Sequence, residues 1–135
     1  MRQLTTAVYN KLAGSALETA LGGRLFEDQA PEGTPYPFAV YSITADRPID
    51  TFTDKIDDVL IQFSLFSLSN STGEIKDLYA NLRTLYDGCD LVISGNTFIQ
   101  MERVNMYPLP EDITTPEGTR RVQHYAVDYG IIQQR

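Results

Sequence analysis

Hydrophobic residues recur at every third or fourth position through roughly the first twenty residues, which is the spacing of an amphipathic helix. The apolar positions are Leu4, Val8, Leu12, Ala16, Leu17, Ala20 and Leu21. Gly14 interrupts this pattern, and Ser15–Glu18 directly after it has the form of a capping box that starts a new helix. The pattern therefore predicts two short helices with a bend between them, ended by Gly22 and Gly23.

Apolar and polar residues alternate in four later segments, which predicts β-strands. These segments are Arg24–Asp28, Pro37–Ala45, Lys55–Ser69 and Val122–Gln133. Within the third, one face is uniformly apolar and consists of Val59, Ile61, Phe63 and Leu65. Such a face is expected where a sheet packs against a layer of helices. Between the second and third strands, Asp46–Asp58 is expected to form a polar excursion rich in Asp.

The segment Ser71–Gly88 carries the clearest helical pattern in the chain. Its first residues, Ser71–Glu74, form a second capping box, and Gly88 is expected to end the helix. The apolar stripe consists of Ile75, Leu78, Tyr79, Leu82, Leu85 and Tyr86. Beyond it, Leu91–Ile93 and Thr97–Met106 flank Gly95–Asn96, an arrangement that predicts a hairpin.

The segment Asn105–Arg121 contains three prolines and no periodicity, which predicts a long loop of a kind that often binds a partner. Together the elements predict an α+β fold, in which a bent N-terminal helix and one central helix pack on a mainly antiparallel sheet. A chain of 135 residues that is 42% hydrophobic fits one domain spanning residues 1–135. The apolar fraction is too high for a disordered tail, and a single Cys excludes a disulfide framework.

Acidic residues outnumber basic ones by 18 to 11, which gives a formal net charge of −7. This balance disfavours a broad cationic surface for wrapping nucleic acid or binding anionic lipid. Thr, Asn and Lys interrupt each apolar run near the N-terminus, so no signal-peptide core is indicated. No stretch approaches the ~18 consecutive apolar residues of a membrane span. We therefore expect a cytosolic protein without a membrane partner.

Residues with catalytic potential are few, and we expect neither catalysis nor a cofactor or metal. His124 is the only histidine, and a polar sheet face accounts for it as well as a catalytic role would. Asp128 lies on the same strand face as His124, but the two residues are roughly 13 Å apart along the strand, which is too far for a direct pair. Cys89 has no second Cys and no metal-ligand spacing around it, which predicts a bystander thiol. The glycines match neither a dinucleotide-binding fingerprint nor a P-loop.

Two groups of charged residues define candidate surfaces. The first consists of Asp50, Asp54, Asp57 and Asp58. These aspartates lack the ligand spacing of a Ca²⁺ loop, so a solvated acidic loop is expected. The second combines Arg103, Arg120, Arg121 and His124. Such a cluster would make a small anion site, and the corresponding alternative function is a small cytosolic anion-binding domain.

The order of motifs resembles the tail completion family of long-tailed phages and gene transfer agents. The resemblance rests on a Gly-Gly-Arg-apolar-aromatic step at Gly22–Phe26, an Ala-Pro-x-Gly segment at Ala30–Gly33 and a Pro-aromatic start of a strand at Pro37–Phe38. Downstream, an Asp-rich loop, a long strand centred on Phe63 and Phe66, a capped helix and antiparallel strands follow in the same order.

This resemblance implies a tail terminator, a structural virion protein that forms a hexameric ring of like subunits. The ring would cap the tail tube at the neck end of the virion and bind the tail tube protein and the head-tail connector, after assembly in the host cytoplasm. A head-tail connector or head-closure ring is the related alternative. DNA would pass through the channel without specific binding.

We expect the four aspartates to face the channel, where their negative charge would repel DNA and let it slide. The long loop supplies the candidate partner or oligomer residues, Tyr107, Leu109, Glu111, Asp112, Ile113, Arg120 and Arg121.

Overall fold

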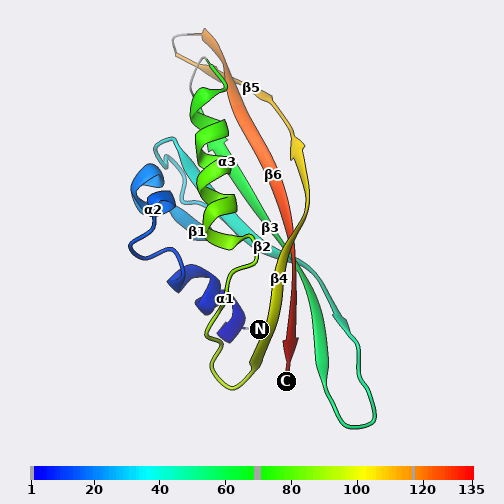
Figure 1. Ribbon diagram of the computed structural model, residues 1–135. Helices are drawn as coiled ribbons and strands as arrows, with labels where there is room; N and C mark the ends of the chain where they lie inside the picture. Colours follow the sequence, from blue (N-terminus) through cyan, green and yellow to red (C-terminus); the bar gives the residue numbers. More distant parts are fainter. Residues whose placement is uncertain (1, 69–70, 117) are drawn as a thin grey trace.

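Helices cover one face of a mixed β-sheet in the computed structural model (Figure 1), which describes residues 2–68, 71–116 and 118–135. In chain order the elements are α1 (Arg2–Asn10), α2 (Ala16–Leu21), β1 (Leu25–Glu27), β2 (Phe38–Pro48), β3 (Ile56–Ser67), α3 (Gly73–Tyr86), β4 (Thr97–Pro108), β5 (Glu111–Thr115) and β6 (Gly118–Gln134). The predicted α+β class is confirmed.

The N-terminal helices bend where the sequence predicted. Ser15 is the N-cap of α2, and its hydroxyl oxygen accepts a hydrogen bond from the backbone N–H of Glu18 at 3.1 Å. Gly22 ends the helix with φ +60°, a left-handed conformation that glycine adopts without steric cost. The Ser15 cap and the glycine stop are therefore confirmed, whereas the Glu18 carboxylate accepts a hydrogen bond from the amide of Gly14 at 3.3 Å rather than from that of Ser15.

The sheet has the strand order β1-β2-β3-β6-β4. Strand β1 runs parallel to β2, whereas the β2–β3, β3–β6, β4–β6 and β5–β6 pairs are antiparallel. Strands β4 and β5 follow each other along the same partner, because β4 pairs with the second half of β6 and β5 with its first five residues. The outer edge of the sheet is thus a long composite strand.

The core lies between the helices and the inner sheet face. All four residues predicted for the apolar face of β3 are fully buried. From the stripe of α3, Ile75, Leu78, Leu82 and Tyr86 are buried, while Tyr79 and Leu85 are partly buried against them. The helical period of α3 and the twofold period of β3 therefore identified the two surfaces that pack together.

The predicted start of α3 is wrong in detail. Its N-cap is Thr72, whose side chain makes no capping hydrogen bond, rather than Ser71. The carboxylate of Glu74, which a capping box would turn back to the backbone, instead accepts a hydrogen bond from the hydroxyl of Ser67 at 2.5 Å. Glu74 therefore binds Ser67 at the end of β3 rather than the backbone at the start of α3.

Much of the predicted polar excursion, Asp46–Asp58, forms strand. Strand β2 continues to Pro48 and β3 begins at Ile56, so that Arg47 pairs with Asp58 in an antiparallel hairpin. Figure 1 shows this β2–β3 hairpin extending away from the helices. Because no helix covers it there, this part of the hairpin carries no buried apolar face, and its strands show no alternation in the sequence.

Two predictions for the C-terminal half are also wrong. Leu91–Ile93 forms no strand, and β4 pairs with β6 instead of making a hairpin around Gly95–Asn96. The predicted loop Asn105–Arg121 is mostly the end of β4, strand β5 and the start of β6. Pro108 ends β4 at the sheet edge, where the missing N–H of a proline costs no ladder bond, and Pro110 and Pro116 lie in the connections on either side of β5.

Candidate functional site

The four aspartates of the predicted acidic loop all lie on the β2–β3 hairpin. Asp50 and Asp54 belong to the hairpin tip, which we define as residues 49–55, and the other two lie on β3. Asp50 contacts two cations: its Oδ1 lies 2.7 Å from Nη2 of Arg135, and its Oδ2 lies 3.6 Å from Nζ of Lys55. Arg135, directly after β6, therefore links the C-terminal end of the sheet to the hairpin tip.

Two further aspartates are also paired. Asp57 is only 7% exposed, and its Oδ1 lies 3.0 Å from Nε of Arg135. Asp58 lies 3.0 Å from a guanidinium nitrogen of Arg47 across the hairpin. Asp54 differs, because it accepts a hydrogen bond from the side-chain amide of Gln134 at 3.0 Å. Three of the four carboxylates thus have a cationic partner, and the surface is less negative than the sequence suggested.

The hairpin tip also carries apolar residues that sequence reasoning missed. Phe52 is fully exposed and Ile49 is 42% exposed. An isolated aromatic residue inside a polar segment gives no periodic signal, so the alternation pattern could not identify it. The available signal was its composition, a Phe between two threonines in an otherwise acidic turn.

The candidate partner residues, predicted as a loop, lie together on one β-arm formed by the end of β4, by β5 and by the start of β6. Asp112 and Arg121 face each other in the register and form an ion pair of 3.3 Å, and Ile113 pairs with Arg120. Tyr107 and Leu109 are 44% and 47% exposed on the strand edge. The arm is an exposed edge with apolar side chains, a feature typical of association surfaces.

His124 stacks on the outer sheet face, opposite the helices. Its ring centroid lies 4.3 Å from that of Phe66, which in turn stacks on Phe38 at 4.8 Å. Its Nδ1 lies 3.5 Å from a carboxylate oxygen of Glu111. Burial lowers the pKa of His124 below its ordinary value, although Glu111 acts in the opposite direction. The ring therefore acts as a neutral aromatic member of a stack. Asp128, on the same face, accepts a hydrogen bond from Gln62 at 3.0 Å.

The arginines of the alternative anion site do not gather in one place. Arg103 pairs with Tyr129 in the strand register, nine residues along β6 from Arg120, which corresponds to about 30 Å at ~3.3 Å per residue. The guanidinium of Arg103 donates to the Tyr79 hydroxyl at 2.6 Å and lies 3.5 Å from Asp87. The arrangement gives Arg103 a structural role between α3 and β4.

Cys89 is half-buried, and its Sγ lies 3.6 Å from Sδ of Met101. Burial raises the pKa of the Cys89 thiol, which keeps it protonated and weakly nucleophilic.

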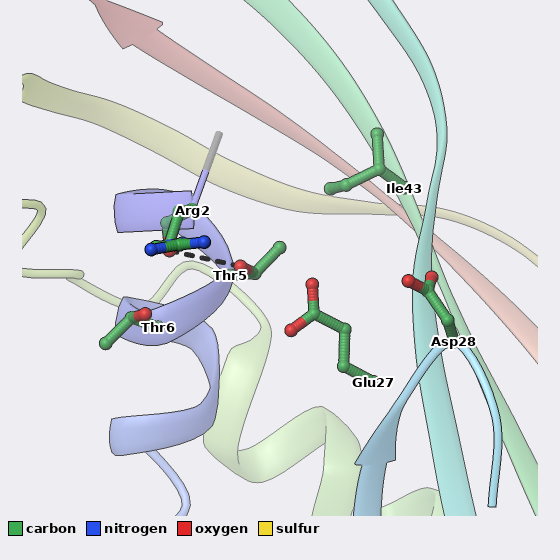
Figure 2. A pocket seen from close by; sticks show the side chains of 6 residues that line it. All are labelled: Arg2, Thr5, Thr6, Glu27, Asp28 and Ile43. Atoms are coloured by element: carbon green, nitrogen blue, oxygen red, sulfur yellow. Dashed lines mark hydrogen bonds between the residues drawn. The ribbon is translucent and has the colours of Figure 1, made fainter.

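A polar hollow of about 540 Å³ lies between α1, β1 and β2. Figure 2 shows Glu27 between the side chains of Thr5 and Asp28. Thr5 donates its hydroxyl to the carbonyl oxygen of Arg2 within α1. Asp28 has φ +64°, a conformation that Asp tolerates better than most residues. Among the described residues, no group of three or more His, Cys, Asp or Glu is placed to hold a metal ion.

Across the described parts of the chain, the helices fall short of the length and apolar character needed to span a membrane.

Comparisons with known proteins give the family. A model of the family described as "Tail completion protein gp17" matches residues 6–132. A chain from the virion of a native gene transfer agent particle has a similar fold, with a TM-score of 0.63 at 20% identity, and the match covers 96% of this chain and 94% of that one. A second solved chain matches with a TM-score of 0.53 at 10% identity over the same shares. No curated protein matches the sequence. Since the family model spans nearly the whole chain, the protein belongs to the tail completion protein gp17 family.

Proposed function

We propose that this chain is a tail terminator, a structural protein that assembles into a ring on the end of a tail tube and joins the tube to the head-tail connector. The observation that carries the proposal is the family match over residues 6–132, which describes a tail completion protein. The similar chain in a gene transfer agent virion covers nearly the full length of both chains and supports the same fold. The expected location is the virion tail.

The geometry supports assembly as the mode of action. The β2–β3 hairpin, the composite β4–β5 edge and the helix layer are three different surfaces of one small subunit. A ring of like subunits needs such unlike surfaces, because each contact in it joins one patch to a different patch on the next copy. The edge carries four exposed apolar residues, Ile99, Val104, Tyr107 and Leu109. Exposed apolar side chains on a strand edge favour association with another chain.

A particle-producing strain without this chain tests the proposal. Heads and tails should form but fail to join, and wild-type chain supplied in trans should restore complete particles. An affinity label on the restored chain should lie at the neck end of the tail in particle images. Normal joining without the chain, or a label at the far tip of the tail, would contradict the proposal.

The channel-facing position of the four aspartates stays a prediction. Reversing all four aspartates to Lys should impede DNA passage, but the same change also breaks the ion pairs of three of them. Asp54→Lys is the cleaner variant, because Asp54 contacts Gln134 rather than a cation. Asp77→Lys on the exposed side of α3 is the matched control. DNA transfer by complete particles is the measurement, and equal transfer by the two variants would count against a channel role.

A further inference from the structure

We propose that Phe52 at the hairpin tip of one subunit inserts into a groove beside α1 of the next copy of this chain. The groove lies between α1 and residues 90–94, and we call it the α1 groove. The inference rests on the proposed ring and goes beyond it, because it assigns the two surfaces that meet between neighbouring subunits.

The hairpin tip is built to present Phe52. Backbone hydrogen bonds close the turn, with the amide of Ile49 donating to the carbonyl of Ile56 at 2.7 Å and the amide of Thr51 donating to the carbonyl of Asp54 at 2.9 Å. In return, the amide of Asp54 donates to the Thr51 hydroxyl at 3.0 Å. The turn is thus held on both sides, while the ring of Phe52 is fully exposed. An ordered, solvent-exposed aromatic residue is the usual form of an interface anchor.

The α1 groove consists of two adjoining hollows of about 430 and 330 Å³. Ala7, Asn10 and Val92 line both of them. Val92 is 95% exposed because its neighbours Leu91 and Ile93, each 6% exposed, point into the core. An extended segment places successive side chains on opposite faces, so burial of Leu91 and Ile93 forces Val92 outward.

The charges around the two surfaces are complementary. Phe52 lies between Asp50 and Asp54 in the sequence of the tip. Arg2 lines the larger hollow of the α1 groove, and Lys11 lines the smaller one together with Asp90. Neither Arg2 nor Lys11 forms an ion pair with any residue that the structure describes. Because Asp50 is already paired with Arg135 and Lys55, Asp54 is the carboxylate beside the aromatic anchor that is left to meet the two cations lining the groove.

The contact joins two different patches, so each subunit would offer a tip to one neighbour and a groove to the other. Such a head-to-tail contact repeats from copy to copy and closes into a ring when the rotation allows it. Under this arrangement Asp50 and Asp54 lie at the boundary between subunits, so for these two aspartates the tip contact and the channel-facing position are alternatives.

A disulfide trap on the purified chain tests the contact directly. In a Cys89→Ser background, one preparation carries Thr53→Cys, directly beside the retained Phe52 on the exposed tip, and a second carries Val92→Cys. A disulfide requires Cα atoms roughly 4.4–6.8 Å apart, a distance that insertion of the tip into the groove would provide. The mixture under mild oxidation should give about tenfold more crosslinked dimer than either preparation alone, because docking raises the effective thiol concentration.

The matched control replaces Thr53→Cys by Asp77→Cys on the exposed side of α3, outside both surfaces. Mixed with Val92→Cys, it should give no crosslink above background. A mixture that gives no heterodimer, homodimers in each single preparation at the yield of the mixture, or equal crosslinking through Asp77→Cys would each overturn the proposal. Because the trap captures weak contacts, it needs no stable ring in solution.

Particle assembly supplies the second readout and separates the two levels of inference. Phe52→Asp and Val92→Asp should each reduce the recovery of complete particles, by at least about tenfold if Phe52 is an interface anchor. Loss with Phe52→Asp but not with Val92→Asp would show that the tip binds a different tail protein, which overturns the groove contact. If the wild-type chain itself restores no particles, the proposed function fails, whatever the trap shows.

Discussion

Removal of one buried hydroxyl should measurably loosen the helix that forms the α1 groove. Tyr86 at the end of α3 is fully buried, and its hydroxyl donates to the carbonyl oxygen of Val8 at 2.7 Å. This carbonyl lies near the C-terminal end of α1, where the following amides of Lys11 and Leu12 donate to Ala7 and Tyr9 instead. The hydroxyl thus satisfies a helix-end acceptor that has lost its usual partner.

Tyr86→Phe keeps the packed ring and removes only this donor. A buried carbonyl left without a hydrogen bond costs about 1–2 kcal/mol. For a domain of this size the melting temperature should fall by roughly 3–8 °C. Burial raises the pKa of Tyr86, so the hydroxyl remains a protonated donor at neutral pH.

Thermal unfolding followed by circular dichroism and chemical denaturation are suitable assays. Tyr9→Phe is the matched control, because Tyr9 is 47% exposed on α1 and a surface change of this kind shifts stability by no more than about 0.5 kcal/mol. If Tyr86→Phe is as stable as Tyr9→Phe, the hydrogen bond to α1 contributes nothing and the reasoning is refuted.

Three further predictions concern stability. Phe63→Ala removes a fully buried ring and should cost about 3–5 kcal/mol in chemical denaturation; a cost below that of Tyr86→Phe would contradict its central position. His124 has a lowered pKa in the folded chain, so the unfolded chain binds more protons and the stability of the fold should decrease as the pH drops below about 6.5. This decrease should be smaller in His124→Phe, and equal pH profiles of stability for the two proteins would contradict the prediction. Arg135→Gln should cost about 1 kcal/mol because Asp57 keeps a buried charge, whereas Arg121→Gln, in an exposed pair, should cost less than about 0.5 kcal/mol.

The sequence determined the elements that build the core. The helices around Gly14, the stripe of α3 and the inner face of β3 were predictable, because burial of one face imposes a period on the residues that form it. The likeness to tail completion proteins was also visible in the sequence, and the family match confirms it.

The tertiary structure decided everything that lies outside the core. The β2–β3 hairpin and the β4–β5 edge extend beyond the helix layer or along the sheet margin, where burial imposes no period and prolines are tolerated. Strand β4 pairs with β6, far away in the sequence, and no local pattern can specify such a partner. Ion pairs that join Asp50 and Asp57 to Arg135 likewise depend on strands meeting in space. The exposed position of Val92 has a similar cause, because it depends on the burial of Leu91 and Ile93 in the core.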